Sequence, residues 1–408
     1  MLQQPAFGRC LRKLRMDRGL SQSALAGDGM STGYLSRLES GARQPTTRAV
    51  SYLADRLGLE PTDFEEPAGG SSLAHALSLV ASSGADSTIE TLREALAGED
   101  DAAPALRWQA LWLLARHRRV QGDHRGEREY LTGLVRLGDE VGVPELRVRG
   151  LTRLARCLRS LGEIPAAIDA AVAADRLART DALSAEDRAA ALLALVSVEA
   201  EASRLPESRA HADELVALLA GRADALWAEA MWTAAAVRVR QGDYAGAQDC
   251  LEQALEKFSS NDDLVLWLRL RLAAGRLHLT KVPAQPEAAE RCILAAESAL
   301  VLVGTPGLRQ ELTALKADLA FLTRRYDDAR ALLGELALEE PRMTYRDWVR
   351  LDIMRHQLRI LSGDDTGVQG LRALAEQAQA DANIDLAAEI WRILAESLAQ
   401  LQRGAATA

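Results

Sequence analysis

The spacing of apolar and polar residues is helical along nearly the whole chain. Apolar positions return every three or four residues, and runs with the two-residue period of a strand are scarce. Glycine, proline and serine interrupt this pattern at short intervals, as expected for turns between helices. The pattern therefore predicts an all-α protein.

The first 66 residues form one predicted domain of five short helices. Apolar residues recur at helical spacing between capping and breaking residues. The predicted boundaries are Gly19 at the end of the first helix, Ser21 and Ser31 at the starts of the second and third, Gly41 at the end of the third, Thr46 or Thr47 at the start of the fourth, and Pro61 to Phe64 for the last turn. The third helix buries Tyr34, Leu35 and Leu38, which turns its other face outward and suits it to the DNA major groove.

Beyond a predicted linker at 67–72, a glycine-containing or polar turn recurs every 37 to 43 residues through 73–408. The turns lie at Gly84-Ala85, Gly122-Asp123-His124, Gly162-Glu163-Ile164, Gly242-Asp243-Tyr244, Arg325-Tyr326-Asp327 and Gly363-Asp364-Asp365, with less regular ones near Leu205-Pro206 and Val282-Pro283. A fixed period in this range indicates a solenoid of helix pairs. We predict about eight pairs, closed by an amphipathic capping helix from Leu386 to Leu401.

Charge separates the two parts of the chain. Residues 1–59 carry a net charge of +5, which leaves −14 on the remaining 349 residues of a chain whose total is −9. A basic patch favours phosphate binding, whereas an acidic body resists nonspecific contact with nucleic acid. DNA contact is therefore expected from the N-terminal domain alone.

The chain shows no sign of a catalytic, cofactor or metal site. Its six histidines and four cysteines share no spacing with a metal partner or nucleophile, and we expect the cysteines to be small buried residues in a reducing compartment. No Walker or dinucleotide-binding motif is present. Because no apolar run is long enough for a membrane span, a cytoplasmic protein that is not an enzyme is expected.

The segment from Gly19 to Pro45 resembles the XRE family of helix-turn-helix regulators. This resemblance implies that Gln22 and Arg43 position the DNA backbone, that Ser31, Thr32, Ser36 and Arg37 read bases, and that Arg15 and Glu39 form an internal salt bridge. Two departures stand out. The turn after Ala26 is about one residue short, and Gly33 removes a side chain from a position that commonly reads a base.

The unit from Ala228 to Asn261 resembles a tetratricopeptide repeat. Such a right-handed array presents the first helix of each pair on its concave face, where a ligand is expected to bind. The residues placed there are Trp112, Arg116, Arg119, Arg149, Arg153, Arg156, Trp232 and Arg269, with Glu199, Glu229 and Arg276 farther along. The alternative is a solvated face on which the arginines pair with nearby carboxylates such as Glu127 or Glu129.

The two parts together resemble the RRNPP group of Gram-positive regulators that sense short signalling peptides. This resemblance implies a homodimer on a palindromic double-stranded DNA operator, with a peptide or small molecule as effector. The chain has only two asparagines, Asn261 and Asn383, so it lacks the asparagine ladder that commonly holds peptides in these sensors. The alternative is a DNA-tethered scaffold that binds another protein without a diffusible ligand.

Overall fold

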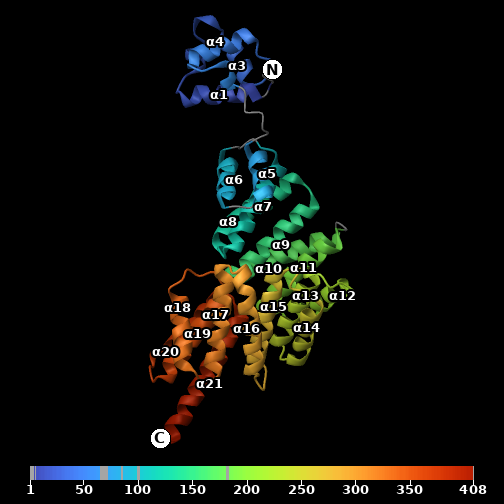
Figure 1. The fold of residues 1–408 in the computed structure, drawn as a ribbon, viewed down its shortest axis with the longest axis vertical. Coiled ribbons are helices and arrows are strands. Elements are labelled where there is room, and N and C mark those ends of the chain that lie inside the picture. The colour runs from blue at the N-terminus through green and yellow to red at the C-terminus, as the bar shows by residue number, and fades with distance from the viewer. Residues whose placement is uncertain are drawn as a thin grey trace. The chain divides into compact units, whose positions relative to one another are not determined.

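The computed structural model describes residue 4 and residues 6–64, 72–83, 86–98, 102–180 and 183–407. Within these ranges the chain is helical and contains no strand, which confirms the all-α prediction. It forms two compact units, residues 1–102 and 103–408 (Figure 1). Apart from Ser72, the linker predicted at 67–72 lies outside the described residues, as does the Gly84-Ala85 turn, and these boundaries stay predictions.

Over residues 6–64, the first unit has four α-helices and two short 3₁₀ turns. They are α1 (Ala6–Asp17), α2 (Gln22–Ala26), η1 (Gly27–Gly29), α3 (Thr32–Glu39), α4 (Thr47–Leu57) and η2 (Pro61–Phe64). Ser21, Ser31 and Thr46 each accept a hydrogen bond from the backbone N–H three residues later, so the expected N-caps are in place. Phe7 and Leu35 belong to the buried core that these elements share. The helix pair α5 (Ser72–Ser83) and α6 (Asp86–Gly98) completes the unit.

In the residues described, the second unit consists of seven helix pairs and a final single helix. Its elements are α7 (Pro104–Val120), α8 (His124–Val141), α9 (Pro144–Leu161), α10 (Ile164–Thr180), α11 (Ala185–Glu201), α12 (Leu205–Leu218), α13 (Ala225–Arg240), α14 (Tyr244–Lys257), α15 (Leu264–Thr280), α16 (Pro286–Val303), α17 (Pro306–Leu322), α18 (Tyr326–Ala337), α19 (Tyr345–Leu361), α20 (Thr366–Ala380) and α21 (Ile384–Thr407). Fully buried alanines such as Ala155, Ala167 and Ala247 let neighbouring helices approach closely.

The turns within the pairs explain both the regular and the irregular part of the repeat. Gly122, Gly162, Gly242 and Gly363 all have φ between +72° and +80°, a conformation that costs glycine little. At the turns beside Leu205-Pro206 and Arg325-Tyr326-Asp327, which lack this glycine, the positive φ falls on Ser203 and Arg324. These two turns therefore keep the positive-φ conformation without glycine.

The helical array of the second unit closes on itself. Helix α9 contacts α19, and α11 contacts α21, although more than 180 residues separate each pair along the chain. Arg342 Nη1 donates a hydrogen bond to the carbonyl oxygen of Gln121 at 3.1 Å, and Asn383 Nδ2 donates to that of Gly162 at 3.0 Å. The early repeats are thus joined to the last ones through backbone groups in their turns.

Candidate functional sites

The N-terminal half of α3 faces solvent. Ser31, Thr32, Gly33, Ser36 and Arg37 are all exposed, while Leu35 and Leu38 on the opposite side are fully buried. The Ser31 side chain is partly committed, because its Oγ accepts a hydrogen bond from the backbone N–H of Tyr34 at 3.2 Å. The structure therefore brings together the residues that the sequence predicted as base readers on one accessible helical face.

Arg43 and Gly33 extend this surface. The Arg43 guanidinium lies 4.7 Å from the centre of the Tyr34 ring, and its backbone carbonyl accepts a hydrogen bond from Gln4 Nε2. A Cβ added at Gly33 would meet no heavy atom within 4 Å. Packing within the domain therefore does not require glycine at position 33. Because Gly33 has no side chain, the backbone of α3 is accessible at this point of the exposed face.

A buried ion pair holds this face in place. Arg15 donates to both carboxylate oxygens of Glu39, at 2.6 and 3.0 Å, and Gln22 Nε2 donates to Glu39 Oε2 at 2.7 Å. Burial alone would raise the pKa of Glu39, but hydrogen bonds from Arg15 and Gln22 and the charge of Arg15 lower it. The predicted pair of Arg15 and Glu39 is thus formed. The Gln22 amide, expected at the DNA backbone, is bonded within the domain.

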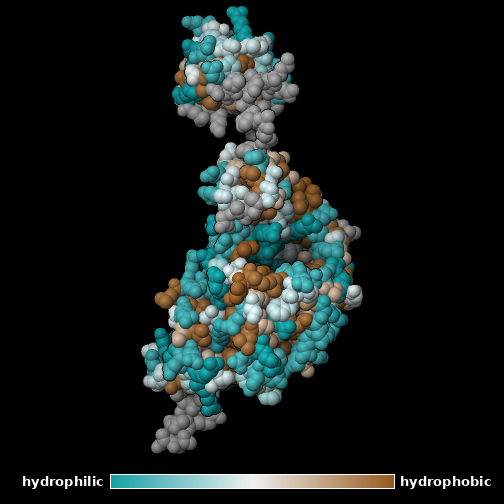
Figure 2. All heavy atoms as spheres, viewed as in Figure 1, coloured by the Kyte–Doolittle hydropathy of each residue, from teal (hydrophilic) through white to brown (hydrophobic). Residues whose placement is uncertain are grey.

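A small cavity in the second unit lies at the start of the predicted concave face. It has a volume of about 110 Å³, and its lining includes four of the predicted ligand residues: Trp112, Arg149, Arg153 and Arg156. The indole of Trp112 stacks on Trp108 with ring centres 5.3 Å apart. Figure 2 shows hydrophilic side chains around a hollow near α9.

Three buried polar atoms of the residues around this cavity have no hydrogen-bond partner. They are Thr152 Oγ1, Arg153 Nε and Arg156 Nε. Buried polar groups are rarely left unpaired, because each costs about 1 to 3 kcal/mol without a partner. Two of the three are obligate donors, so the cavity is suited to a group that accepts hydrogen bonds.

The Arg153 guanidinium is the most confined cation of this face. Its side chain is 14% exposed, it lies 5.3 Å from the centre of the Trp112 ring, and its ion pair with Glu127 is long at 3.8 Å. Burial, followed by the charge of Arg119, lowers the pKa of Arg153 to about 10. Arg119 and Arg116 are exposed, and neither forms an ion pair with any side chain in the described ranges. Of Arg116, Arg119 and Arg153, only Arg153 has a carboxylate partner among the described residues, so these three arginines carry more positive charge than their partners neutralise.

Three more of the predicted arginines pair with carboxylates on other helices. Arg149 binds Asp187 through two hydrogen bonds of 2.7 and 3.2 Å, Arg156 lies 3.4 Å from Glu229, and Arg269 lies 3.8 Å from Glu311. The pairs of Arg153 and Arg156 use carboxylates named from the sequence, Glu127 and Glu229, whereas Asp187 and Glu311 were not named. Trp232 is half-buried and packs against the main core of the array.

A chain of ion pairs that sequence reasoning missed links five helices inside the array. Glu201 on α11 joins Arg159 on α9 and Arg240 on α13, at 2.6 and 3.7 Å. Asp385 on α21 then joins Arg240 and Arg346, at 3.5 and 2.6 Å. The carboxylate predicted for this face, Glu199, instead binds the His211 ring on α12. Only the pitch of the superhelix brings these partners together.

In the described residues we find no reactive cysteine cluster, no metal-binding group and no membrane-spanning helix. Cys157, Cys250 and Cys292 are buried, as expected, and burial raises the pKa of each thiol, whereas Cys10 is only half-buried. Within the ranges described, no three His, Cys, Asp or Glu side chains are grouped as a metal site. None of the helices described there has the length and apolar character needed to cross a bilayer.

Comparison with known protein families identifies the N-terminal segment. Residues 6–66 match the family model described as a helix-turn-helix domain. This segment is a helix-turn-helix domain. A comparison with curated proteins finds no match for the chain.

Solved structures show the fold that follows the helix-turn-helix domain. A Rap protein complexed with Competence and Sporulation Factor covers 98% of this chain and 99% of its own, at 11% identity and a TM-score of 0.54. PlcR of Bacillus thuringiensis, with the peptide PapR7 and DNA, covers 77% and 98%, at 15% identity and a TM-score of 0.43. A tetratricopeptide repeat protein from Parabacteroides merdae covers 70% and 98%, at 16% identity and 0.42. The chain joins a helix-turn-helix domain to an array of helix pairs, and its fold is similar to that of the Rap protein.

The short turn of the helix-turn-helix domain has a local explanation. Gly27–Gly29 forms a 3₁₀ turn, and Tyr52 on α4 spans it: its Oη donates to the carbonyl of Ala26 at 2.8 Å and accepts from the N–H of Gly29 at 3.1 Å. A Cβ at Gly29 would lie 2.4 Å from the Tyr52 ring. Glycine at 29 thus leaves room for the tyrosine that fixes the entry to α3, a role the sequence did not reveal.

Proposed function

We propose that the protein is a transcription regulator that binds DNA through its helix-turn-helix domain and whose repeat unit binds a peptide or small anion that modulates this binding. The observation that carries the proposal is the exposed face of α3, from Ser31 to Arg37, within a matched helix-turn-helix domain. An exposed helix of this kind fits the major groove, where side chains contact base edges. The basic balance of residues 1–59 favours the same contact.

Substitutions in the helix-turn-helix domain test its DNA contacts. Selection of bound sequences from a random DNA pool should show that Arg37→Ala relaxes the preference at one or two base positions, at a cost of about 1 to 3 kcal/mol on the best site. Gln22→Ala removes the amide that donates to Glu39 beside α3, and it should weaken binding to all sequences about equally. The control Arg372→Ala changes an exposed arginine of α20. Equal, sequence-independent losses from Arg37→Ala and Gln22→Ala would contradict the assignment of base reading to Arg37.

The ligand half of the proposal rests on the cavity beside Trp112. Two guanidinium N–H donors and one hydroxyl lack partners there, and Arg116 and Arg119 add unpaired positive charge nearby. A carboxylate would satisfy these donors, and the Trp112 ring offers an apolar contact beside it. A cavity of about 110 Å³ holds one end group rather than a whole ligand, so the rest would extend along the array. The similar Rap fold, solved with a bound factor, is consistent with this arrangement.

Arg153→Gln tests the ligand site. With the peptide fraction of a culture extract as probe, we expect the melting temperature and the affinity for a selected DNA site to change together in the native protein. Arg153→Gln should require at least ten times more extract for the same response, because it removes a desolvated cation from the cavity. Arg372→Gln should respond normally. A normal response of Arg153→Gln would exclude this cavity as the ligand site.

A homodimer on a two-fold operator completes the proposal. Helix α21 buries Leu386, Ile390 and Leu394 against the array, yet Ile384, Trp391 and Leu398, spaced seven residues apart, are 38% to 50% exposed. An apolar stripe with this period suits packing against a second helix. Sedimentation velocity at micromolar concentration tests this part, and a strictly monomeric protein would remove dimerisation from the proposal.

The ion pairs inside the array support the alternative function. They join α9, α11, α13 and α21 through Glu201 and Asp385, so these interior charges have partners within the chain itself. A scaffold that binds another protein without a diffusible ligand requires only a rigid array of this kind. If only a macromolecular fraction changes both the melting temperature and the DNA affinity, the scaffold function replaces the sensor.

A further inference from the structure

A second, larger cavity lies between α12, α13 and α14, away from the predicted concave face. Its volume is about 510 Å³, within the range of small-molecule sites. Its floor is apolar and buried, formed by Trp227, Met231 and Cys250, which are 5%, 4% and 7% exposed. None of the residues predicted for the ligand site lines it.

Helix α13 separates this cavity from the interior of the array. At 100° of rotation per residue, Trp227, Met231 and Arg238 lie within about 40° of one another around the helix. Glu229 and Arg240, which form the interior ion pairs, lie about 200° away. The cavity is therefore on the opposite side of α13 from the ion-paired interior.

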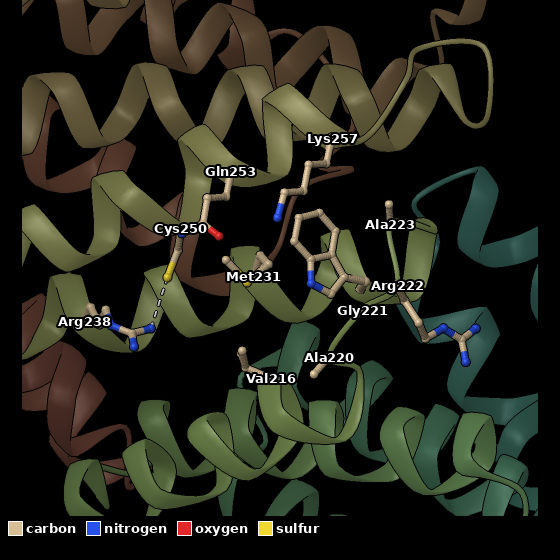
Figure 3. A pocket seen from close by; sticks show the side chains of 11 residues that line it. Val216, Ala220, Gly221, Arg222, Ala223, Met231, Arg238, Cys250, Gln253 and Lys257 are labelled. Carbon is tan, nitrogen blue, oxygen red and sulfur yellow. Dashed lines mark hydrogen bonds between the residues drawn. The ribbon is translucent and has the colours of Figure 1, made fainter.

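The cavity is cationic. Arg222, Arg238 and Lys257 are among its lining residues, and no lining residue is acidic. Arg222 binds Glu186 and Asp224, and its guanidinium points away from the cavity in Figure 3. Arg238 donates to Cys250 Sγ at 3.1 Å and has carboxylates 3.5 and 3.8 Å away. These two arginines are already occupied.

Lys257 is the cation that remains available. Its Nζ points into the cavity in Figure 3 and lies 5.4 Å from the centre of the Trp227 ring. No carboxylate of the described residues forms an ion pair with it. A charged amine above a buried indole offers an anionic group a partner on one side and an aromatic body an apolar contact on the other.

We propose that this cavity is a binding site for a small aromatic carboxylate. The carboxylate pairs with Lys257, the ring contacts Trp227 and Met231, and the exposed amide side chain of Gln253 lies at the rim. A cationic ligand is disfavoured by the charge of Lys257, and a neutral one gains only the apolar contact. Because Ala220 and Gly221 form one wall with little side-chain bulk, the opening admits a planar group.

Calorimetric titration of the full chain with three indoles of different charge tests this site. We expect indole-3-acetate to bind at least ten times more tightly than the neutral alcohol tryptophol, and tryptamine to bind most weakly. Lys257→Gln should lower the affinity for indole-3-acetate about tenfold and leave that for tryptophol unchanged. Ala220→Trp, at an exposed wall position, should abolish binding of both.

Two control variants separate this site from others. Lys316→Gln, at a lysine that pairs with Glu297, and Arg153→Gln, in the concave cavity, should bind indole-3-acetate normally. Equal affinities for the three indoles, no binding of indole-3-acetate, or normal binding by Lys257→Gln would overturn the proposal. Loss of binding in Arg153→Gln would overturn it too, because the probe would then occupy the concave cavity. The function proposed above survives each of these results.

Discussion

Arg15→Ala should destabilise the helix-turn-helix domain by about 3 to 5 kcal/mol, because it leaves the Glu39 carboxylate buried without its cation. The two side chains are only 12% and 4% exposed, so the native pair is largely shielded from water. A loss of this size is comparable with the whole stability of a domain of about 60 residues. Hydrogen exchange of the amides in α1–α4 measures it in the full chain.

The pH dependence of this effect has a definite sign. In the native protein the pKa of Glu39 is lowered, so the pair contributes stability above the ordinary glutamate pKa and loses it as the pH falls through the lowered value. In Arg15→Ala, burial without the cation favours the protonated acid, so the defect should shrink on acidification. Glu39→Gln added to Arg15→Ala should recover part of the stability at pH 7. A defect that is independent of pH would show that the ion pair is not its cause.

Gly162→Ala should open the closed array. Its φ of +80° disfavours alanine by about 1 to 2 kcal/mol, and the added Cβ would lie 2.5 Å from the Tyr345 ring on α19. The Asn383 side chain, which donates to the Gly162 carbonyl, would lose its partner as the ring moves. We expect faster hydrogen exchange in α19 and α21 and a larger radius of gyration by small-angle scattering.

Gly242→Ala is the matched control for this prediction. Gly242 occupies the equivalent turn between α13 and α14 with φ of +78°, but a Cβ there meets no atom within 4 Å. Both variants carry the same backbone strain, and only Gly162→Ala disturbs the contact with α19. If both raise the radius of gyration equally, strain in the turns rather than loss of closure is responsible.

Local features were predictable from the sequence because they depend on neighbouring residues. Ser21 and Ser31 were identified as caps from their positions before apolar runs, and the turns at Gly122 and Gly242 from their recurring motif. The Arg15 and Glu39 pair followed from resemblance to a known family and could not have been derived from periodicity. The fourth helix shows the limit, since only the structure decides that Thr46 rather than Thr47 is its cap.

The interior of the array could not be predicted in the same way. The arginines of α7 and α9 were predicted on a common face, and the structure brings Arg149, Arg153 and Arg156 to one cavity. Their partners, however, lie far along the chain: Asp187 is 38 residues from Arg149, and Glu229 is 73 from Arg156. The rotation from one repeat to the next decides which carboxylate lies beside which arginine. Small differences in helix length change this rotation, and the changes add up along the array. For the same reason Glu199 was expected on this face, whereas Glu201 occupies it.

Closure fixes the number of repeats in this protein. In an open solenoid each repeat touches only its neighbours, so duplication or loss of one helix pair leaves the others undisturbed. Here the turns at Gln121 and Gly162 bond to Arg342 and Asn383, and any inserted or deleted pair between them would move donors and acceptors out of reach. We therefore expect natural variants of this chain to differ in loop length and surface residues, while the count of helix pairs from α7 to α21 stays constant through their evolution.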